Sequence, residues 1–251
     1  MANFTDLSGK AAICAGVGAL GAAAAELLAA AGARVVCADI DGARCADVAG
    51  SLPGESHIGR ELDLTDPVAI TNLVASCREE LGSVDIVVHT AAVLEHLPID
   101  EIDSDDWDRH MDVNVKSAFF LFRTAANVMR EQVQGGRLIA FTSGCWLYGG
   151  QFGRLPYCTT KGAVTTMTRH FARLYGPDGI TVNAIAPGLI DTPMMLNSLT
   201  AERRRELEEA TPLGRFGTPE EIAGVVLFLA SPLGSFVSGA TLNVSGGFTL
   251  Y

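Results

Sequence analysis

The sequence is short of positive charge. Its 251 residues hold 18 Lys and Arg against 29 Asp and Glu, which gives a formal net charge of −11 at pH 7. A surface with this excess of negative charge repels the phosphates of nucleic acids. We therefore expect no nucleic-acid partner.

Paired cysteines are missing as well. The six cysteines contain no C-x-x-C motif, and most of them lie among apolar residues. This pattern predicts buried, reduced thiols rather than a disulfide framework or a metal site. The acidic run 100–108, DEIDSDDWD, lacks the glycine and the alternating ligands of a calcium loop. Ser104 as the N-cap of a helix with an acidic first turn explains that run better, so we expect no bound metal.

The marks of export and membrane insertion are also absent. The stretch MANFTDLSGK at the start has no basic segment followed by an apolar one, so it does not resemble a signal peptide. The alanine-rich run after Ala11 is interrupted by Glu26 and by glycines, and it is too short to span a bilayer. These absences predict a cytoplasmic protein with no membrane partner.

What the sequence does contain is an alternation of short apolar runs with longer segments of helical periodicity. No linker or repeat divides it, so we expect a single domain over residues 1–251. The alternation predicts an α/β fold, a doubly wound parallel sheet with helices on both faces and ligand-binding loops along one edge. The predicted strands are 11–14, 34–38, 86–89, 137–141, 181–185 and 241–244, and the predicted helices are 21–31, 67–80, 107–129, 157–175 and 219–229.

A glycine-rich turn follows the first predicted strand. Gly16, Gly18 and Gly21 spell G-x-G-x-x-G between a strand and a helix, where bare backbone and a helix N-terminus suit a pyrophosphate. Asp39 ends the next strand, at the position of an acid that binds ribose hydroxyls and repels a 2′-phosphate. The pattern favours NAD over NADP. The alternatives are a turn used only for packing and an acid that is merely solvated.

A second group of residues lies in the second half of the chain. Tyr157 and Lys161 are four residues apart on one face of a predicted helix, so the ammonium group can lie beside the phenol. A neighbouring cation lowers the pKa of a phenol from its ordinary value near 10. Ser143, at the end of a strand, can hold a substrate oxygen against the tyrosine. Taken alone, a Tyr-x-x-x-Lys pair is more often a plain surface pair.

These motifs, together with VNAIAPGLIDTPM at 182–194 and in this order, resemble the short-chain dehydrogenase/reductase family over essentially the whole chain. The resemblance implies a Rossmann fold, a nicotinamide cofactor and a small-molecule alcohol or ketone substrate. It also implies a homotetramer, assembled through the helices that carry Asn114 and Tyr157 and through the C-terminal segment. Several matches in sequence order are harder to obtain by chance than any one of them.

The resemblance also assigns roles to residues. Tyr157 would exchange the proton, Ser143 would hydrogen-bond the same substrate oxygen, Lys161 would lower the pKa of the tyrosine, and Asn114 would act through a water. The implied cofactor contacts are Gly16, Gly18, Leu20, Gly21, Asp39, Asp63, Leu64, Ala91, Tyr157, Lys161, Pro187, Gly188, Ile190 and Thr192.

The family's pocket loops are less informative. They map to 93–97, 146–155 and 189–213, with a mostly apolar lining and Arg154 as a further polar candidate; plain packing explains each of these residues about as well. Residues 201–210 are expected to form a solvated helix in a mobile lid. The implied substrate contacts are Glu95, His96, Trp146, Tyr148, Phe152 and Met194.

Two stretches depart from the family pattern. The family's loop T-G-x-x-x-G-x-G maps onto Cys14, Ala15, Ala19 and Gly21, so two of its glycines are alanine and the visible G-x-G-x-x-G is out of register. A Cβ at a position that needs a positive φ costs about 1–2 kcal/mol, and we expect weaker cofactor binding from it. The stretch VVHTAAV replaces three residues of the family's N-N-A-G. His89 in that stretch is interpreted as a structural strand-end residue, with a role near the cofactor as the alternative.

The sequence therefore predicts an NAD(H)-dependent dehydrogenase that interconverts a secondary alcohol and a ketone, with a medium-sized, apolar or cyclic substrate. One alternative is an NADPH-dependent 3-oxoacyl or polyketide-type ketoreductase, against which Asp39 argues. The other is a catalytically silent family member, against which the intact Asn114, Ser143, Tyr157 and Lys161 argue.

Overall fold

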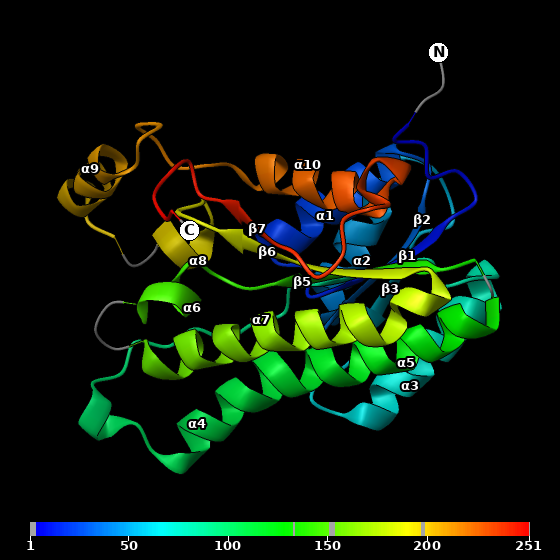
Figure 1. Cartoon of the computed structure of the whole chain (residues 1–251), viewed down its shortest axis with the longest axis horizontal. Coiled ribbons are helices and arrows are strands. Elements are labelled where there is room, and N and C mark those ends of the chain that lie inside the picture. The colour runs from blue at the N-terminus through cyan, green and yellow to red at the C-terminus, as the bar shows by residue number, and fades with distance from the viewer. Residues whose placement is uncertain (1–3, 133, 151–153, 197–198, 251) are drawn as a thin grey trace.

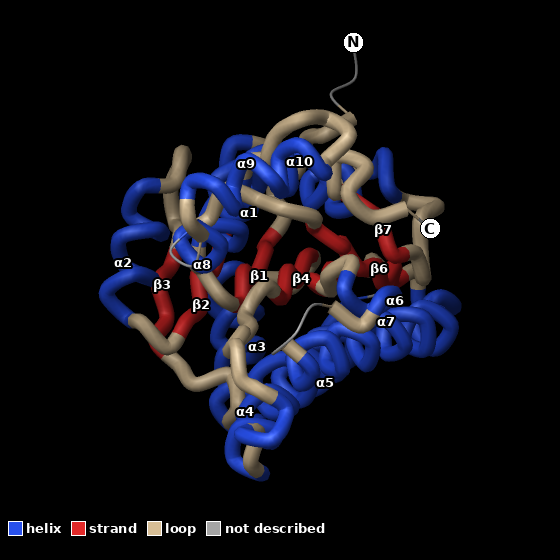
Figure 2. The backbone as a smooth tube through the Cα atoms, turned by 90° about the vertical axis from the view of Figure 1, so that its left-hand side faces the viewer, coloured by secondary structure: helices blue, strands red, loops and turns tan. Residues whose placement is uncertain are grey.

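A computed structural model describes residues 4–132, 134–150, 154–196 and 199–250. Within these ranges, a parallel sheet of seven strands forms the centre of the molecule. The order is β3-β2-β1-β4-β5-β6-β7, and every neighbouring pair is parallel (Figure 2). The expected doubly wound Rossmann architecture is confirmed. The strands are β1 (Ala11–Ala15), β2 (Arg34–Asp39), β3 (Ile58–Glu61), β4 (Ile86–His89), β5 (Gly136–Phe141), β6 (Ile180–Pro187) and β7 (Thr241–Val244).

Helices cover both faces of the sheet (Figures 1 and 2). The helices α1 (Ala19–Ala30), α2 (Gly42–Ser51) and α10 (Pro219–Ala230) lie on one face. The other face carries α3 (Pro67–Leu81), α5 (Ser117–Gln132) and α7 (Leu155–Tyr175). The remaining helical segments are η1 (Ile99–Glu101), α4 (Ser104–Met111), η2 (Asp112–Lys116), α6 (Cys145–Tyr148), η3 (Gly176–Asp178), α8 (Pro193–Leu196), α9 (Ala201–Ala210) and η4 (Pro232–Gly234).

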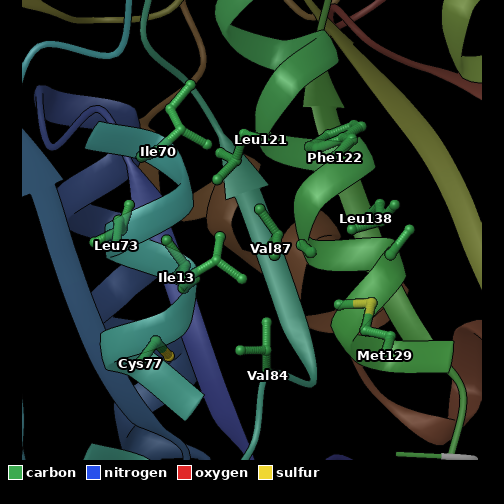
Figure 3. Packing of buried hydrophobic residues seen from close by; sticks show 14 of the residues in the cluster. Ile13, Ile70, Leu73, Cys77, Val84, Val87, Leu121, Phe122, Met129 and Leu138 are labelled. Atoms are coloured by element: carbon green, nitrogen blue, oxygen red, sulfur yellow. The ribbon is translucent and has the colours of Figure 1, made fainter. Parts of the chain in front are cut away.

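The strands are apolar on both faces because both faces are covered. Successive residues of β1 alternate between the two cores: Ile13 faces α3 and α5, whereas Cys14 faces α1 and α10. Burial of each large aliphatic side chain contributes about 1.5–3 kcal/mol to stability. Figure 3 shows the first core, in which Ile70, Leu73, Cys77, Leu121, Phe122 and Met129 of the helices meet Ile13, Val84, Val87 and Leu138.

The predicted helix 107–129 is longer than expected and is interrupted. It begins at Ser104, and the turn Asp112–Lys116 is a π-helix between α4 and α5. The expected N-cap was wrong by one residue. Asp103 is the cap, because its carboxylate accepts a hydrogen bond from the Asp106 N–H at 2.9 Å while the Asp106 carboxylate accepts one from the Asp103 N–H.

The sequence analysis missed several elements, among them the strand β3 and the helix α2. The edge strand β3 reads IGRE, and its residues are half-buried or exposed, so it lacks an apolar pattern. The helix α2 begins with a glycine; its N-cap is Asp41, which accepts a hydrogen bond from the Arg44 N–H at 3.0 Å. The other predicted elements are confirmed to within one or two residues at most ends. In the described ranges no helix is both long enough and apolar enough to cross a bilayer.

Candidate active site

The predicted site residues lie at the carboxyl edge of the sheet. The segments α6, α8 and α9, which follow β5 and β6, gather at one end of the molecule, on the left in Figure 1. In an open parallel sheet this is the edge at which ligands bind.

The glycine turn after β1 is tightly packed against the loop after β4. Gly16 has φ +88°, and a Cβ there would lie 2.7 Å from Ala91 Cα. The Thr90 hydroxyl donates a hydrogen bond of 2.5 Å to the Gly16 carbonyl, and the Ala91 N–H donates one of 3.1 Å to Ala15. A Cβ at Gly21 would collide with the Gly16 carbonyl oxygen and lie 2.7 Å from Thr90 Oγ1. Gly16 and Gly21 are therefore required by geometry.

Ala15 and Ala19, which the sequence analysis placed at glycine positions of the family, are not strained. Among the described residues Ser56 is the only non-glycine with a positive φ, so Ala15 and Ala19 adopt ordinary backbone conformations. Ala15 pairs with Ala38 and His89 inside the sheet, and Ala19 starts α1. The strain expected from the family pattern is not there. Gly18 is also free of constraint, because a Cβ there would meet nothing within 4 Å.

Asp39 faces the glycine turn, as its place in the fingerprint predicts. One carboxylate oxygen accepts a hydrogen bond from the Val17 N–H at 2.8 Å, and the other accepts one from Asp41 at 3.1 Å. Arg44 approaches the same carboxylate at 3.9 Å and pairs with Asp41 at 3.0 Å. The acid therefore stands at the end of β2 beside the turn.

These residues fit a nicotinamide dinucleotide. The helix α1 has no capping side chain at Gly18 and no acid in its first turn, so its N–H groups and dipole favour a phosphate. Leu20 is half-buried in that first turn. After β3, Asp63 is exposed and accepts hydrogen bonds from the N–H and hydroxyl of Thr65 at 2.8 Å, while Leu64 is buried in the core.

The loop after β6 carries the remaining predicted cofactor contacts. Pro187 ends β6, and the Gly188 N–H donates a hydrogen bond of 3.0 Å to Val244. Ile190 is buried in a bridge with Gly217, which ties this loop to the segment before α10. The carbonyl of Thr192 accepts hydrogen bonds from the N–H groups of Met195 and Leu196 in α8, at 3.0 and 2.9 Å.

Ser143, Tyr157 and Lys161 come together as predicted. Ser143 follows β5, and its hydroxyl lies close enough to the Tyr157 phenol to lower the pKa of that phenol. The Lys161 ammonium lies 5.3 Å from the centre of the Tyr157 ring and donates a hydrogen bond of 2.9 Å to the Phe141 carbonyl. Phe141 is the last residue of β5, so the sheet edge itself holds the lysine.

The protonation of these groups is governed by burial. Burial lowers the pKa of Lys161 to about 8. Burial also raises the pKa of Tyr157 above its ordinary value, while the Ser143 hydrogen bond and the Arg154 charge lower it. The sequence analysis expected Lys161 to lower the pKa of Tyr157; in this structure that pKa is raised instead, and burial is the largest cause.

Asn114 lies in the π-turn and grips the loop after β4. Its side-chain amide donates hydrogen bonds of 3.0 Å to the Val93 carbonyl and to Thr160 Oγ1, and its oxygen accepts one of 2.8 Å from the Val93 N–H. Asn114 is buried, so its two hydrogen bonds to the Val93 backbone fix Val93 beside α7. Its role through a water stays a prediction.

His89 is a structural residue of the strand end. Its Nε2 lies 2.7 Å from Ser117 Oγ, which donates to the Val113 carbonyl, and its ring meets Phe122 edge-on at 6.5 Å. Burial lowers the pKa of His89 to about 3, and the nearby Lys161 charge acts in the same direction. The imidazole is therefore neutral, in keeping with the structural interpretation.

The predicted substrate contacts are not all in one place. Glu95 forms an ion pair of 2.6 Å with Arg109 of α4, whereas a His96 ring nitrogen accepts a hydrogen bond of 3.1 Å from Arg154. The Trp146 ring stacks on the guanidinium of Arg169, and Arg169 lies on α7 about three turns beyond Tyr157. Tyr148 and Met194 are exposed, and Phe152 lies outside the described residues.

Two groups at this edge were not given a role by the sequence analysis. Thr90 holds the glycine turn, and its place directly after a strand opposite that turn was the available signal. The thiols of Cys145 and Cys158 hydrogen-bond each other beside Ser143 and Tyr157, and the bond from Cys158 lowers the pKa of Cys145. No group of three metal-binding side chains occurs in the described part of the chain.

Comparison with known proteins gives consistent matches over nearly the whole chain. A family model described as enoyl-(acyl carrier protein) reductase matches residues 15–249. Galactitol 2-dehydrogenase of Agrobacterium fabrum (strain C58) is 34% identical over 238 residues, which is 91% of this chain and 92% of that protein. Meso-2,3-butanediol dehydrogenase of Serratia marcescens is 35% identical, covering 92% of this chain and 90% of its own.

Among solved structures, a 7 alpha-hydroxysteroid dehydrogenase complexed with NADH and 7-oxo glycochenodeoxycholic acid superimposes with a TM-score of 0.94. It is 32% identical, and the match covers 100% of this chain and 99% of that one.

Proposed function

The chain belongs to the short-chain dehydrogenase/reductase family, and we propose that it is an NAD(H)-dependent oxidoreductase that interconverts a secondary alcohol and a ketone. The observation that carries this proposal is the convergence of Ser143, Tyr157 and Lys161 at the sheet edge, beside Asn114. The nicotinamide cofactor, when bound, supplies or accepts the hydride.

The side chains of this site have complementary tasks. Tyr157 exchanges a proton with the substrate oxygen, and the Ser143 hydroxyl orients that oxygen and stabilises the charge that develops on it. Lys161, which the Phe141 carbonyl holds in place, stabilises the phenolate as it forms. A lysine with a pKa of about 8 gives up or takes a proton readily near neutral pH, which suits a relay.

The preference for NAD rests on Asp39. Its carboxylate stands beside the glycine turn and repels a 2′-phosphate, and the sequence from Ala15 to Leu28 offers no Lys or Arg to bind one. An NADPH-dependent ketoreductase is the alternative that the binding test below separates.

We also propose that the chain forms one catalytic domain and assembles as a homotetramer. An open, apolar groove between the α4–α5 helix and α7 supports the assembly, because its lining of Met111, Val115, Phe119, Ala163 and Met167 suits a second copy of the same helices. The substrate is a medium-sized alcohol or ketone. A cytoplasmic location stays a prediction.

The proposal is tested by the substitution Tyr157→Phe. We expect the variant to bind NADH with the affinity of the unmodified protein, because Asp39 is untouched. Both proteins should bind NADH at least about tenfold more tightly than NADPH. We expect its turnover of secondary alcohols with NAD to fall by a factor of at least about 100, because the proton-exchanging hydroxyl is gone. Fluorescence titration and steady-state kinetics on an alcohol panel measure the two quantities.

The matched control is Tyr175→Phe, which removes a hydroxyl at the far end of the same helix. An unchanged rate in Tyr157→Phe contradicts the role of this residue. Tighter binding of NADPH favours the alternative ketoreductase and contradicts the role of Asp39. Failure to bind either cofactor points to a catalytically silent family member.

A further inference from the structure

Arg154 is a cation beside the site without a carboxylate partner. It is half-buried, and it takes part in none of the ion pairs formed by the described residues. Its Nε donates to the His96 imidazole at 3.1 Å, and its Nη groups donate no hydrogen bond to any described residue. In a chain with 29 acids and 18 bases, a half-buried guanidinium that faces only a neutral ring is unusual.

Arg154 lies at the start of the helix that carries Tyr157, the residue proposed to exchange the proton. It is the N-cap of α7, with φ −119° and ψ 19°, and it precedes Tyr157 by three residues. Its positive charge lowers the pKa of the Tyr157 phenol and acts in the same direction on Tyr148. A group bound by Arg154 therefore lies close enough to the Tyr157 phenol for charge to act between them.

His96 reaches Arg154 from the other side of the site. It belongs to the loop after β4, which Asn114 fixes through the backbone of Val93. The neighbouring acid, Glu95, is drawn away by its ion pair with Arg109. The pair Arg154–His96 thus bridges two loops that are 58 residues apart in the sequence, and it leaves Arg154 as the unpaired charge at this point.

We propose that Arg154, assisted by His96, binds an anionic group on the substrate, so that the substrate is an oxo acid, a hydroxy acid or a phosphate ester. This inference rests on the proposed function, which it narrows from alcohols and ketones in general. The guanidinium offers its remaining N–H donors in a fork that matches a carboxylate or a phosphate in a two-point contact. His96 accepts the hydrogen bond from the Arg154 Nε and so orients this fork.

The test compares ketones that differ in charge. Reduction by NADH is measured for acetoacetate and levulinate against acetoacetamide and levulinamide, and for dihydroxyacetone phosphate against dihydroxyacetone. The proteins are the unmodified chain, Arg154→Gln, Arg154→Lys and the control Arg173→Gln, which removes an exposed charge at the other end of α7. Binding of the same anions is followed by tryptophan fluorescence with and without NADH.

We expect kcat/KM for an anionic ketone to exceed that of its neutral partner and to fall about 10- to 100-fold in Arg154→Gln, as for the loss of a charge-assisted hydrogen bond. The neutral ketones should lose much less, because for them only the effect of the Arg154 charge on the pKa of Tyr157 is removed. Arg154→Lys should recover part of the loss on anionic ketones, and Arg173→Gln should match the unmodified protein. The carboxylate and phosphate arms show which anion is bound.

Equal use of charged and neutral ketones by the unmodified protein overturns the inference. An equal loss on both kinds in Arg154→Gln also overturns it, since the residue then acts on Tyr157 or on the fold. Because anion binding is also measured without cofactor, a protein that fails to bind NADH contradicts the proposed function while the anion titration still decides the inference.

Discussion

At the scale of single residues, the glycine turn is governed by contacts rather than by the number of glycines. Gly16 and Gly21 are pressed against each other and against Thr90 and Ala91, whereas Gly18 borders open space. The family pattern drew attention to Ala15 and Ala19, which occupy ordinary backbone conformations. The requirement for glycine lies at Gly16, where the left-handed conformation and the close approach of Ala91 coincide.

We expect the same change, glycine to alanine, to have a larger effect at Gly16 than at Gly18. Gly16→Ala combines a Cβ in the left-handed region with a collision against Ala91, so we expect a loss of at least about 2 kcal/mol in the free energy of unfolding and weaker NADH binding. Gly18→Ala should cost less than about 1 kcal/mol, the scale of an N-cap change. Urea unfolding and NADH titration measure both. Equal losses in the two variants would show that the packing against Ala91 is not the constraint.

At the scale of elements, the π-turn Asp112–Lys116 sets the position of the loop after β4. The turn widens the helix at Asn114, whose amide satisfies the N–H and the carbonyl of Val93 together. Through Val93 the turn also fixes the loop that carries Glu95 and His96. One side chain thus positions a loop of the substrate site.

We expect Asn114→Leu to lower the free energy of unfolding by about 1–3 kcal/mol, because it leaves backbone groups of Val93 without partners. Its kcat should fall as well, since the loop beside Tyr157 loses its anchor. The matched control is Asn183→Leu. Asn183 is also buried and binds backbone at both ends of its amide, through Val237 and Ala240 at distances of 2.7 and 3.1 Å.

Asn183→Leu should lose comparable stability in urea unfolding without a specific loss of kcat in the remaining folded enzyme. If the two variants lose kcat equally, Asn114 serves stability alone.

The elements also show what the sequence can predict. Helix α3 was predicted closely because Asp66 caps it, Pro67 starts it and its apolar period is regular. The edge strand β3 has no such pattern, and nothing local marks the π-turn. The convergence of Tyr157 and Lys161 at the sheet edge was predictable from spacing and family resemblance. The contact of His96 with Arg154 was not, because it depends on two loops brought together by the whole fold.

At the scale of the whole molecule, one apolar face is left open. Phe119 of α5 is 37% exposed, stacks on Phe171 at 5.8 Å and lines the groove between the α4–α5 helix and α7. Side chains of this kind on a helix pair are suited to a second copy of the same pair.

We expect the unmodified protein to behave as an assembly of four 26.4-kDa chains in light scattering coupled to size exclusion. Phe119→Glu should dissociate it, because a carboxylate would be buried against its own symmetry mate. Val68→Glu is the control, a change of the same charge at a position of α3 that is 67% exposed. Circular dichroism checks that each variant is folded. A monomeric unmodified protein, or an intact tetramer of Phe119→Glu, would contradict the proposed assembly.

The bonds between the glycine turn and Thr90–Ala91 have a consequence for protein engineering. A cofactor loop taken from a relative brings backbone shaped to fit that relative's own residues after the fourth strand, whereas here Thr90 and Ala91 fill the space beside Gly16. The two loops therefore form one transplantable unit. From Ala91 the same stretch of chain runs on to His96, so a change to the loops of the proposed cofactor site also changes the loop of the proposed substrate contact His96.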